Sequence, residues 1–175
     1  MLNSGTGSYT KSRRRASPAD TDAAVLRSPF ETLRVGVELA SGRITAINFL
    51  AGDAQLLNPA TVAGRVAVDQ IRRYFRDPAF QFTVPLAPRG TAFQQRVWRA
   101  MRDIPAGSVC SYGDLARRLT TSARAVGGAC RHNPVPIIIP CHRVVSSSAL
   151  GGFCGQTNGP MLELKARLLA HERGQ

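Results

Sequence analysis

Residues 123–145 read ARAVGGACRHNPVPIIIPCHRVV, and this stretch carries most of the information about the fold. Its first half predicts a helix that the pair Asn133-Pro134 stops, because a residue before proline avoids the helical region. Three isoleucines set between prolines then predict a buried, extended segment that leads to Cys141. The next residue is His142, and a base near a thiol lowers the thiol pKa from about 8.5 and makes it nucleophilic. Cys141 is therefore the candidate nucleophile.

Further helices are expected before this stretch. Ser111 and Ser122 are the expected N-caps of two short helices joined by a tight turn, because a serine oxygen can satisfy free N–H groups at a helix start. This arrangement is that of a helix-turn-helix, although helical hairpins that never contact DNA share the spacing. An earlier helix should begin after Thr91, and its apolar face would comprise Phe93, Val97, Met101 and Ile104.

The C-terminal segment predicts a loop and then a helix. Glycines at 151, 152, 155 and 159 indicate a loop over residues 146–159. Pro160 suits the first turn of a helix, where a missing N–H costs nothing. The expected apolar stripe of this helix consists of Leu162, Lys165, Leu168 and Leu169, with the stem of the lysine lying along it.

The first half of the chain predicts a small structural α+β unit over residues 25–84. Apolar residues alternate over 33–39 with the period of a half-buried strand, Ser41-Gly42 marks a turn, and 44–50 predicts the next strand. A helix ending near Asp77-Pro78 should follow. Residues 1–24 predict a disordered basic tail, and residues 85–175 form the second domain. In the helix that ends near Asp77-Pro78, the expected apolar positions are Val66, Ile71, Tyr74 and Phe75.

Charge and cysteine content narrow the class of function. The chain has 23 Lys and Arg against 11 Asp and Glu, a net charge of +12, which favours polyanionic partners such as nucleic acid. No run of about 18 apolar residues predicts a membrane span, and no signal peptide is recognisable. The four cysteines form no CxxC pair, so we expect reduced thiols in the cytoplasm and no metal site.

The motif IPCHRV at 139–144 strongly resembles the active-site signature of the O6-alkylguanine-DNA alkyltransferases. SYGDLA at 111–116 and LLAHE at 168–172 resemble further blocks of that family, and the likeness is strong over residues 91–172. The resemblance implies an α+β fold. A small N-terminal antiparallel sheet plus helix, ribonuclease H-like, would precede a mostly helical C-terminal domain with a helix-turn-helix and an active-site cysteine.

The resemblance also implies catalytic roles. Cys141 would accept the alkyl group, and His142 would act as a water-mediated base oriented by Glu172. Asn133 would be the hinge between the recognition helix and the active-site strand, and Tyr112 would donate a hydrogen bond to the departing guanine. The protein would be consumed, one molecule per lesion, with no metal or cofactor. The residues expected to contact the substrate are Tyr112, Cys130, Val144, Phe153 and Cys154.

The expected partner is double-stranded DNA that contains alkylated guanine, bound by a monomer. A lesion inside the stack must flip out before a thiolate can reach it. The resemblance implies that Arg124 enters the duplex from the minor groove and fills the gap. Residues 92–143 contain eight arginines and only two aspartates, and this excess of positive charge suits contacts to phosphates. The residues expected at the DNA are Tyr112, Ala123, Arg124, Ala125, Gly127 and Arg131.

Three other functions remain open at this point. A non-reacting, alkyltransferase-like lesion-binding protein is disfavoured because such proteins replace the cysteine. A fused transcription regulator would carry a cysteine-rich zinc sensor domain that the sequence does not predict. A cysteine hydrolase would need an oxyanion element, and none is evident. Two features depart from the family pattern: the turn at Thr120-Thr121 looks about two residues short, and the loop that ends at Pro160 looks several residues long.

Overall fold

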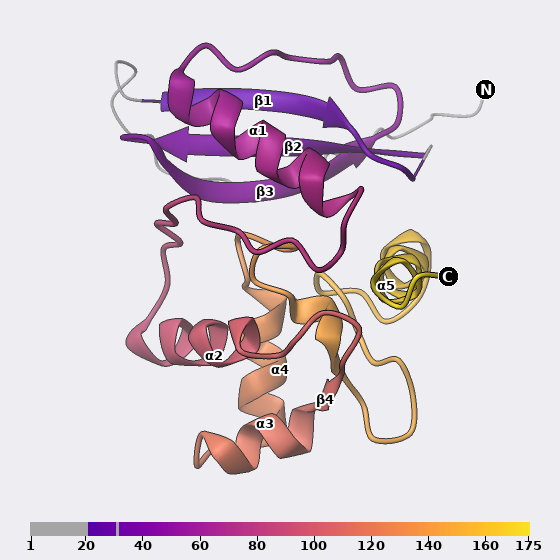
Figure 1. The fold of residues 1–175 in the computed structure, drawn as a ribbon. Coiled ribbons are helices and arrows are strands. Elements are labelled where there is room, and N and C mark those ends of the chain that lie inside the picture. Colours follow the sequence, from indigo (N-terminus) through magenta and orange to yellow (C-terminus); the bar gives the residue numbers. More distant parts are fainter. Residues whose placement is uncertain (1–20, 31) are drawn as a thin grey trace, which may run out of the picture.

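The computed structural model describes residues 21–30 and 32–175. Its first layer is a three-stranded antiparallel sheet, ordered β1-β2-β3, that one helix covers on one face (Figure 1). The turn expected at Ser41-Gly42 is present, and its φ values of 48° and 70° are those that a two-residue hairpin needs. The elements of this layer are β1 (Thr21–Arg27), β2 (Leu33–Ala40), β3 (Arg43–Ala51) and α1 (Val62–Tyr74).

Two expectations for this layer were wrong. Val66 is 46% exposed, because it lies about 100° around the helix axis from Ala67, and α1 buries Ala67 in its place. Ile71 and Tyr74 are buried, as expected. Residues 21–24 were assigned to the basic tail, yet they form the first half of β1 and pair with β2. The other residues of the expected tail, 1–20, lie outside the described part of the chain.

The second layer is mostly helical, as expected (Figure 1). The three expected N-caps are confirmed. Each side chain accepts a hydrogen bond from the backbone N–H three residues later, at Thr91, Ser111 and Ser122. Pro160 occupies the first turn of the last helix, also as expected. The helices are α2 (Ala92–Arg102), α3 (Tyr112–Arg118), α4 (Ala123–Arg131) and α5 (Pro160–Glu172).

The segment that leads to Cys141 is buried, as expected, but it is not extended. Ile137 has a φ of 75°, and the N–H of Ile139 donates to the carbonyl of Val135 at 2.9 Å, which closes a turn. Cys141 then opens the one-turn 3₁₀ helix η2 (Cys141–Arg143). The expected active-site strand is therefore replaced by a turn and a short helix, and β5 (Val144–Val145) begins only after them.

A short parallel pairing places α3 next to η2. Strand β4 (Cys110–Ser111) pairs with β5, with Cys110 opposite Val144. Because α3 starts directly after β4 and η2 ends directly before β5, the first residue of α3, Tyr112, is held close to the segment that contains Cys141.

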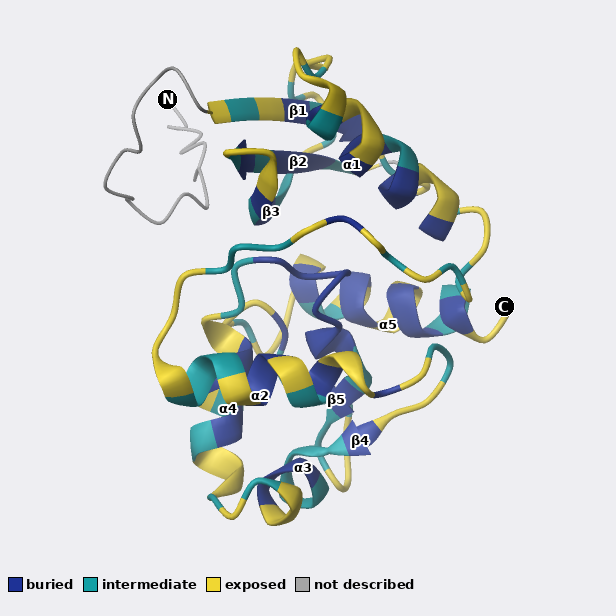
Figure 2. Ribbon diagram, turned by 60° about the vertical axis from the view of Figure 1, so that its left-hand side comes forward, coloured by how far each residue is buried: buried dark blue, intermediate teal, exposed yellow. Residues whose placement is uncertain are grey.

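The two layers share one hydrophobic core. Backbone hydrogen bonds cross between them: Ile47 donates to Pro134 at 2.8 Å, and Ile44 both donates to Pro85 and accepts from Ala87. Buried residues face the junction from both layers (Figure 2). Strand β3 thereby fixes the position of the chain at Pro134, directly after Asn133 and seven residues before Cys141. Among the described residues, no helix is long and apolar enough to span a membrane.

Candidate active site

Cys141 lies at a cavity of about 250 Å³ between α3, α4 and the loop before α5. The residue is only 4% exposed, so a reactant must enter the cavity to meet the thiol. Four of the five residues expected to contact a substrate line this cavity, namely Tyr112, Cys130, Phe153 and Cys154. The fifth, Val144, does not line it, because its side chain is fully buried and its carbonyl accepts a hydrogen bond from Lys165.

Asn133 shapes the turn before Cys141. Its Nδ2 donates to the carbonyl of Ile139 at 2.7 Å, and its Oδ1 accepts from the N–H of Val135 at 3.0 Å. The prolines in this segment have no N–H to donate, so the amide side chain supplies bonds that regular secondary structure would otherwise give. Asn133 therefore holds both ends of the turn, as its expected hinge position implies.

The cavity walls include Tyr112 and a glycine-rich loop. The Tyr112 hydroxyl donates to the carbonyl of Gly152 at 3.2 Å. Gly151, at a φ of 71°, lies so close to the Tyr112 ring that a Cβ there would come within 2.9 Å of it. On the other side, a Cβ on Gly155 would approach Arg131 to 3.1 Å, so this loop also packs on α4.

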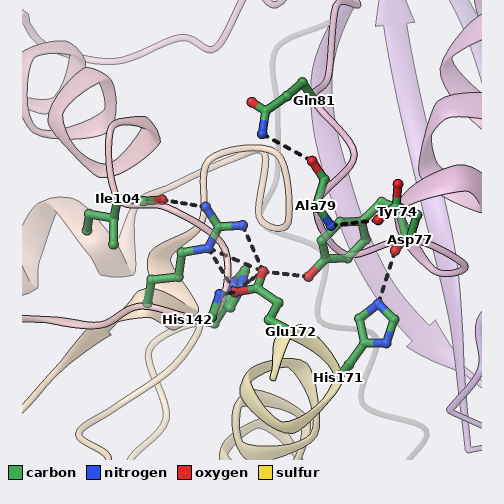
Figure 3. A network of polar contacts seen from close by, with 10 residues as sticks. Tyr74, Asp77, Ala79, Gln81, Ile104, His142, His171 and Glu172 are labelled. Atoms are coloured by element: carbon green, nitrogen blue, oxygen red, sulfur yellow. Dashed lines mark hydrogen bonds and ion pairs between the residues drawn. The ribbon is translucent and has the colours of Figure 1, made fainter. Parts of the chain in front are cut away.

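Glu172 anchors a buried network at the other side of η2 (Figure 3). Its Oε1 lies 2.7 Å from His142 Nε2, and Arg143 donates from Nε to Oε2 at 2.9 Å and from a terminal nitrogen to Oε1 at 2.8 Å. The N–H of Gly107 donates to Oε2 at 3.2 Å. Burial alone would raise the pKa of Glu172, but the hydrogen bonds from His142 and Arg143 hold it well below its usual range. The carboxylate is therefore ionised, and it lies within hydrogen-bond distance of His142 Nε2.

The bond to Glu172 fixes the tautomer of His142. Since the carboxylate accepts, Nε2 carries the proton, and Nδ1 of the neutral ring keeps its lone pair. Nδ1 makes no hydrogen bond to any described protein group. Complete burial lowers the pKa of His142, although the hydrogen bond that it donates to Glu172 opposes this shift. The imidazole is therefore a neutral base with one free acceptor.

Lys165 is a buried cation that the sequence analysis treated only as part of an apolar stripe. Its Nζ donates to the carbonyl oxygens of Val144 and Gly152, at 2.6 and 3.0 Å. Burial lowers the pKa of Lys165 to about 8, and nearby Cys141 opposes this shift. Burial raises the pKa of the Cys141 thiol, whereas the hydrogen bond from Asn133 and the charge of Lys165 lower it. Lys165 is thus a counter-charge for a thiolate at Cys141.

Two more residues of the network were given no role in the site from the sequence. Tyr74, from α1, donates its hydroxyl to Glu172 Oε1 at 2.9 Å, although the sequence analysis found no chemistry in the first half of the chain. Arg143 was not assigned a site role, yet it binds both oxygens of Glu172 and also donates to the carbonyl of Ile104 at 2.5 Å. A lysine at a core position of a helix was the one sequence signal that could have identified Lys165.

The outer face of α4 is open. Val126, Ala129 and Cys130 are buried, and the indole nitrogen of Trp98 fixes the helix by donating to the carbonyl of Ala129 at 2.9 Å. A Cβ added at Gly127 or Gly128 would meet no atom within 4 Å. Five of the six residues expected at DNA belong to α4: Ala123, Arg124 and Arg131 are exposed, and Ala125 and Gly127 are partly exposed. The sixth, Tyr112, is the first residue of α3 and lines the cavity.

A second hollow, of about 850 Å³, adjoins the first. Tyr112 and Gly127 line both cavities. The second one lies between the start of α3, the start of α4 and the segment after β5, and it includes Ser146 and Ser147. Because they share Tyr112 and Gly127, the two hollows lie next to each other beside α4.

Comparisons with known proteins show a likeness to O6-methylguanine methyltransferases. A family model described as the DNA-binding domain of 6-O-methylguanine DNA methyltransferase matches residues 92–174. The methylated-DNA–protein-cysteine methyltransferase of Mycolicibacterium paratuberculosis is 45% identical over 118 residues, which are 66% of this chain and 68% of that protein. The constitutive enzyme of that name from Bacillus subtilis is 43% identical over 110 residues, which are 61% of this chain and 64% of that protein.

Solved structures extend the likeness to the first layer. The crystal structure of Mycobacterium tuberculosis O6-methylguanine methyltransferase has a TM-score of 0.73 at 35% identity, covering 88% of this chain and 93% of that one. A crystal structure of M. tuberculosis OGT in complex with DNA gives the same score and identity, covering 87% and 92%. The sequence matches, by contrast, span between 62% and 68% of the length of the first curated relatives.

Proposed function

The chain belongs to the 6-O-methylguanine DNA methyltransferase family, a family of direct-reversal DNA repair, and we propose that Cys141 accepts the alkyl group from O6-alkylguanine in duplex DNA. The observation that carries this proposal is the position of Cys141. The thiol faces a cavity of small-molecule size, next to a base oriented by an ionised carboxylate. Cys141, His142 and Glu172 all come from one chain, and a monomer in the cytoplasm remains the expected working form.

The reaction is an in-line displacement at the alkyl carbon. The proton of the Cys141 thiol passes through a water molecule to the free Nδ1 of His142, and Glu172 stabilises the resulting imidazolium. The thiolate sulfur forms a bond to the alkyl carbon while the bond from that carbon to guanine O6 breaks. The electron pair goes to O6, and Tyr112 donates a hydrogen bond to the departing base. A thioether remains on Cys141.

The electrostatics of the cavity favour this order of events. Burial opposes ionisation of Cys141, so the free protein holds mostly thiol. Lys165 and the hydrogen bond from Asn133 offset that cost, and both act on charge that develops at the sulfur. A thioether is stable to water, and none of the described groups at the cavity could remove its alkyl group. Each molecule therefore repairs one lesion.

DNA binding follows from the open face of α4. A guanine within the stack cannot reach a thiol that is only 4% exposed, so the nucleotide must be extruded. Small residues on α4 allow close approach to a groove, and Arg124 is exposed at its N-terminal end, where it can fill the space the base leaves. The hollow that adjoins the active-site cavity would receive the sugar and phosphate of the flipped nucleotide.

Intact-protein mass spectrometry after incubation with an O6-methylguanine duplex tests the proposal. We expect one methyl-sized mass increase per protein, located by peptide mapping on Cys141. Cys141→Ala should gain no mass and should still bind the duplex. Cys110→Ala removes another buried cysteine that does not line the cavity, and it should react like the wild type. A protein that binds the duplex and gains no mass would instead be a non-reacting lesion-binding protein.

A further inference from the structure

Tyr74 is the last residue of α1, in the layer to which the sequence analysis assigned only a structural role. The residue is 1% exposed, and its hydroxyl lies 2.9 Å from Glu172 Oε1. The same oxygen lies 2.7 Å from His142 Nε2. Figure 3 shows Tyr74 and His142 approaching Glu172 from different sides. One carboxylate oxygen is thus shared between the proposed base and a tyrosine from the other layer.

The tyrosine ring is held without the help of its hydroxyl. The rings of Phe75 and Phe82 lie 5.6 Å from the Tyr74 ring, centroid to centroid, and the His171 ring packs edge-on at 5.5 Å. His171 also bonds the backbone carbonyl of Tyr74 through Nε2, at 3.0 Å. A phenylalanine would fill the same space without the cost of burying a hydroxyl. The hydroxyl therefore needs an explanation other than packing.

That explanation lies in the charge of Glu172. A hydroxyl that donates to Oε1 takes up part of the negative charge that this oxygen presents to His142. The charged groups that face His142 are Glu172 and Lys165 from α5 and Arg143 from η2. Tyr74 from α1 faces Glu172. Burial and the neighbouring carboxylate both raise the pKa of Tyr74, so the phenol keeps its proton and remains a donor.

We propose that Tyr74 is a positioning residue for alkyl transfer. Its hydroxyl holds Oε1 of Glu172 toward His142 and limits how strongly the carboxylate draws a second proton onto the imidazole. His142 then stays neutral, with Nδ1 free to take the proton of Cys141. This inference rests on the proposed function, and it gives the first layer of the fold a part in the chemistry of the second.

Tyr74→Phe tests the proposal, because it keeps the ring and removes only the hydroxyl. Two rates are measured from pH 5 to 9: single-turnover transfer from a methylated duplex, and alkylation of Cys141 by iodoacetamide in the protein alone. Without the hydroxyl, Glu172 attracts the proton on His142 more strongly, so the acid limb of both profiles should move up by about one pH unit. At a pH on the acid limb, both rates of the variant should therefore be about tenfold lower than those of the wild type.

Two further variants separate positioning from packing. Phe82→Leu disturbs the Tyr74 ring without touching the hydroxyl, and it should lower the melting temperature while leaving the acid limb in place. In a Glu172→Gln background, Tyr74→Phe should have no further effect on either profile, because the tyrosine acts through the carboxylate. An unchanged acid limb in Tyr74→Phe, or an equal shift in Phe82→Leu, would overturn the proposal.

The two rates also distinguish this inference from the function it rests on. If the wild type transferred no methyl group to Cys141, the proposed function would fail, while the iodoacetamide profile would still report on Tyr74. If the wild type transferred normally and both profiles of Tyr74→Phe matched it, only the role of Tyr74 would fail.

Discussion

Lys165 donates a hydrogen bond to the carbonyl of Val144 at 2.6 Å, which places a buried ammonium directly beyond the 3₁₀ helix that begins with Cys141. The lysine comes from α5 and Val144 from β5, so this bond joins two segments on opposite sides of the glycine-rich loop. A second bond, to the carbonyl of Gly152, ties the loop to the same ammonium. One cation thus faces the nucleophile and also holds the cavity wall.

Replacing Lys165 with methionine should slow transfer. Methionine keeps most of the side-chain volume and removes the counter-charge for the Cys141 thiolate, so we expect the single-turnover rate at neutral pH to fall by about tenfold or more, the scale of one lost electrostatic contact. Quenched-flow assays with a methylated duplex measure this rate. Arg167→Met removes an exposed charge from the same helix and should react normally. Equal rates for Lys165→Met and wild type would exclude the electrostatic role.

Asn133→Asp separates the two hydrogen bonds of this side chain. The aspartate keeps an acceptor for the N–H of Val135 and loses the donor to Ile139. The Ile139 carbonyl still accepts the N–H of Cys141 at 2.8 Å. The variant therefore loses one hydrogen bond, worth ~0.5–1.5 kcal/mol of unfolding free energy, and we expect that loss together with slower transfer. Urea denaturation and transfer assays measure the two effects. A variant with unchanged stability would show that the turn does not depend on the Nδ2 donor.

Two glycines in the same loop provide a matched pair for alanine substitution. Gly151 and Gly159 both have a φ of 71°, a backbone region that strains any residue with a Cβ, so alanine should cost each position stability. A Cβ at Gly151 also comes within 2.9 Å of the Tyr112 ring, whereas a Cβ at Gly159 meets nothing within 4 Å. We therefore expect both variants to lose stability and only Gly151→Ala to slow transfer. Similar rates for the two variants would mean that the Tyr112 contact has no effect on the reaction.

Arg124→Ala should affect duplex substrates more than a free guanine analogue. A small analogue enters the cavity without extrusion from a helix, so it does not need a side chain to fill the vacated stack. We expect the ratio of the two transfer rates to shift by about tenfold, the scale of one lost contact worth ~1.4 kcal/mol. Arg118→Ala, which removes an exposed charge from α3, provides a control for general phosphate attraction. A uniform slowing of both substrates would contradict the extrusion role.

Glu172→Gln should change the acid sensitivity of the fold. Hydrogen bonds from His142 and Arg143 outweigh burial and depress the pKa of Glu172 in the folded state, so its stabilising effect is complete above the unfolded pKa of about 4.3 and declines as the pH falls below that value. The difference in unfolding free energy between wild type and variant should accordingly be largest near pH 7 and shrink by pH 3. Urea titrations at several pH values measure it. A constant difference would argue against an ionised Glu172.

Local signals in the sequence predicted local structure well. The caps at Thr91, Ser111 and Ser122 and the turn at Ser41-Gly42 depend on neighbouring residues alone, and each was located correctly. The spacing of apolar residues predicted the small α+β unit of the first half, and the α+β class of the whole chain followed from the family resemblance. The positions of Cys141 and of the residues around its cavity came from motifs, and the structure brings Tyr112, Cys130, Phe153 and Cys154 together as those motifs imply.

The remaining features depend on contacts between distant segments, which apolar spacing does not reveal. Tyr74 meets Glu172 across 98 positions of sequence, so no local pattern could connect them. The turn before Cys141 looked extended because its prolines suggest strand-like backbone, whereas the bonds that fold it come from the side chain of Asn133. Only the stem of Lys165 was expected to lie along the apolar stripe, because burial of its ammonium requires two carbonyl acceptors from other segments.

The hydrogen bonds from β3 to Pro134, Pro85 and Ala87 have a consequence for dissecting this molecule. The boundary between residues 84 and 85 marks a change of sequence pattern, but no gap in the packing coincides with it. A fragment cut there would carry the thiol and its base while leaving Glu172 without its tyrosine and the hinge without its neighbouring strand. The sheet is therefore a structural support for the turn that leads to Cys141, and the two layers cannot be separated without removing that support.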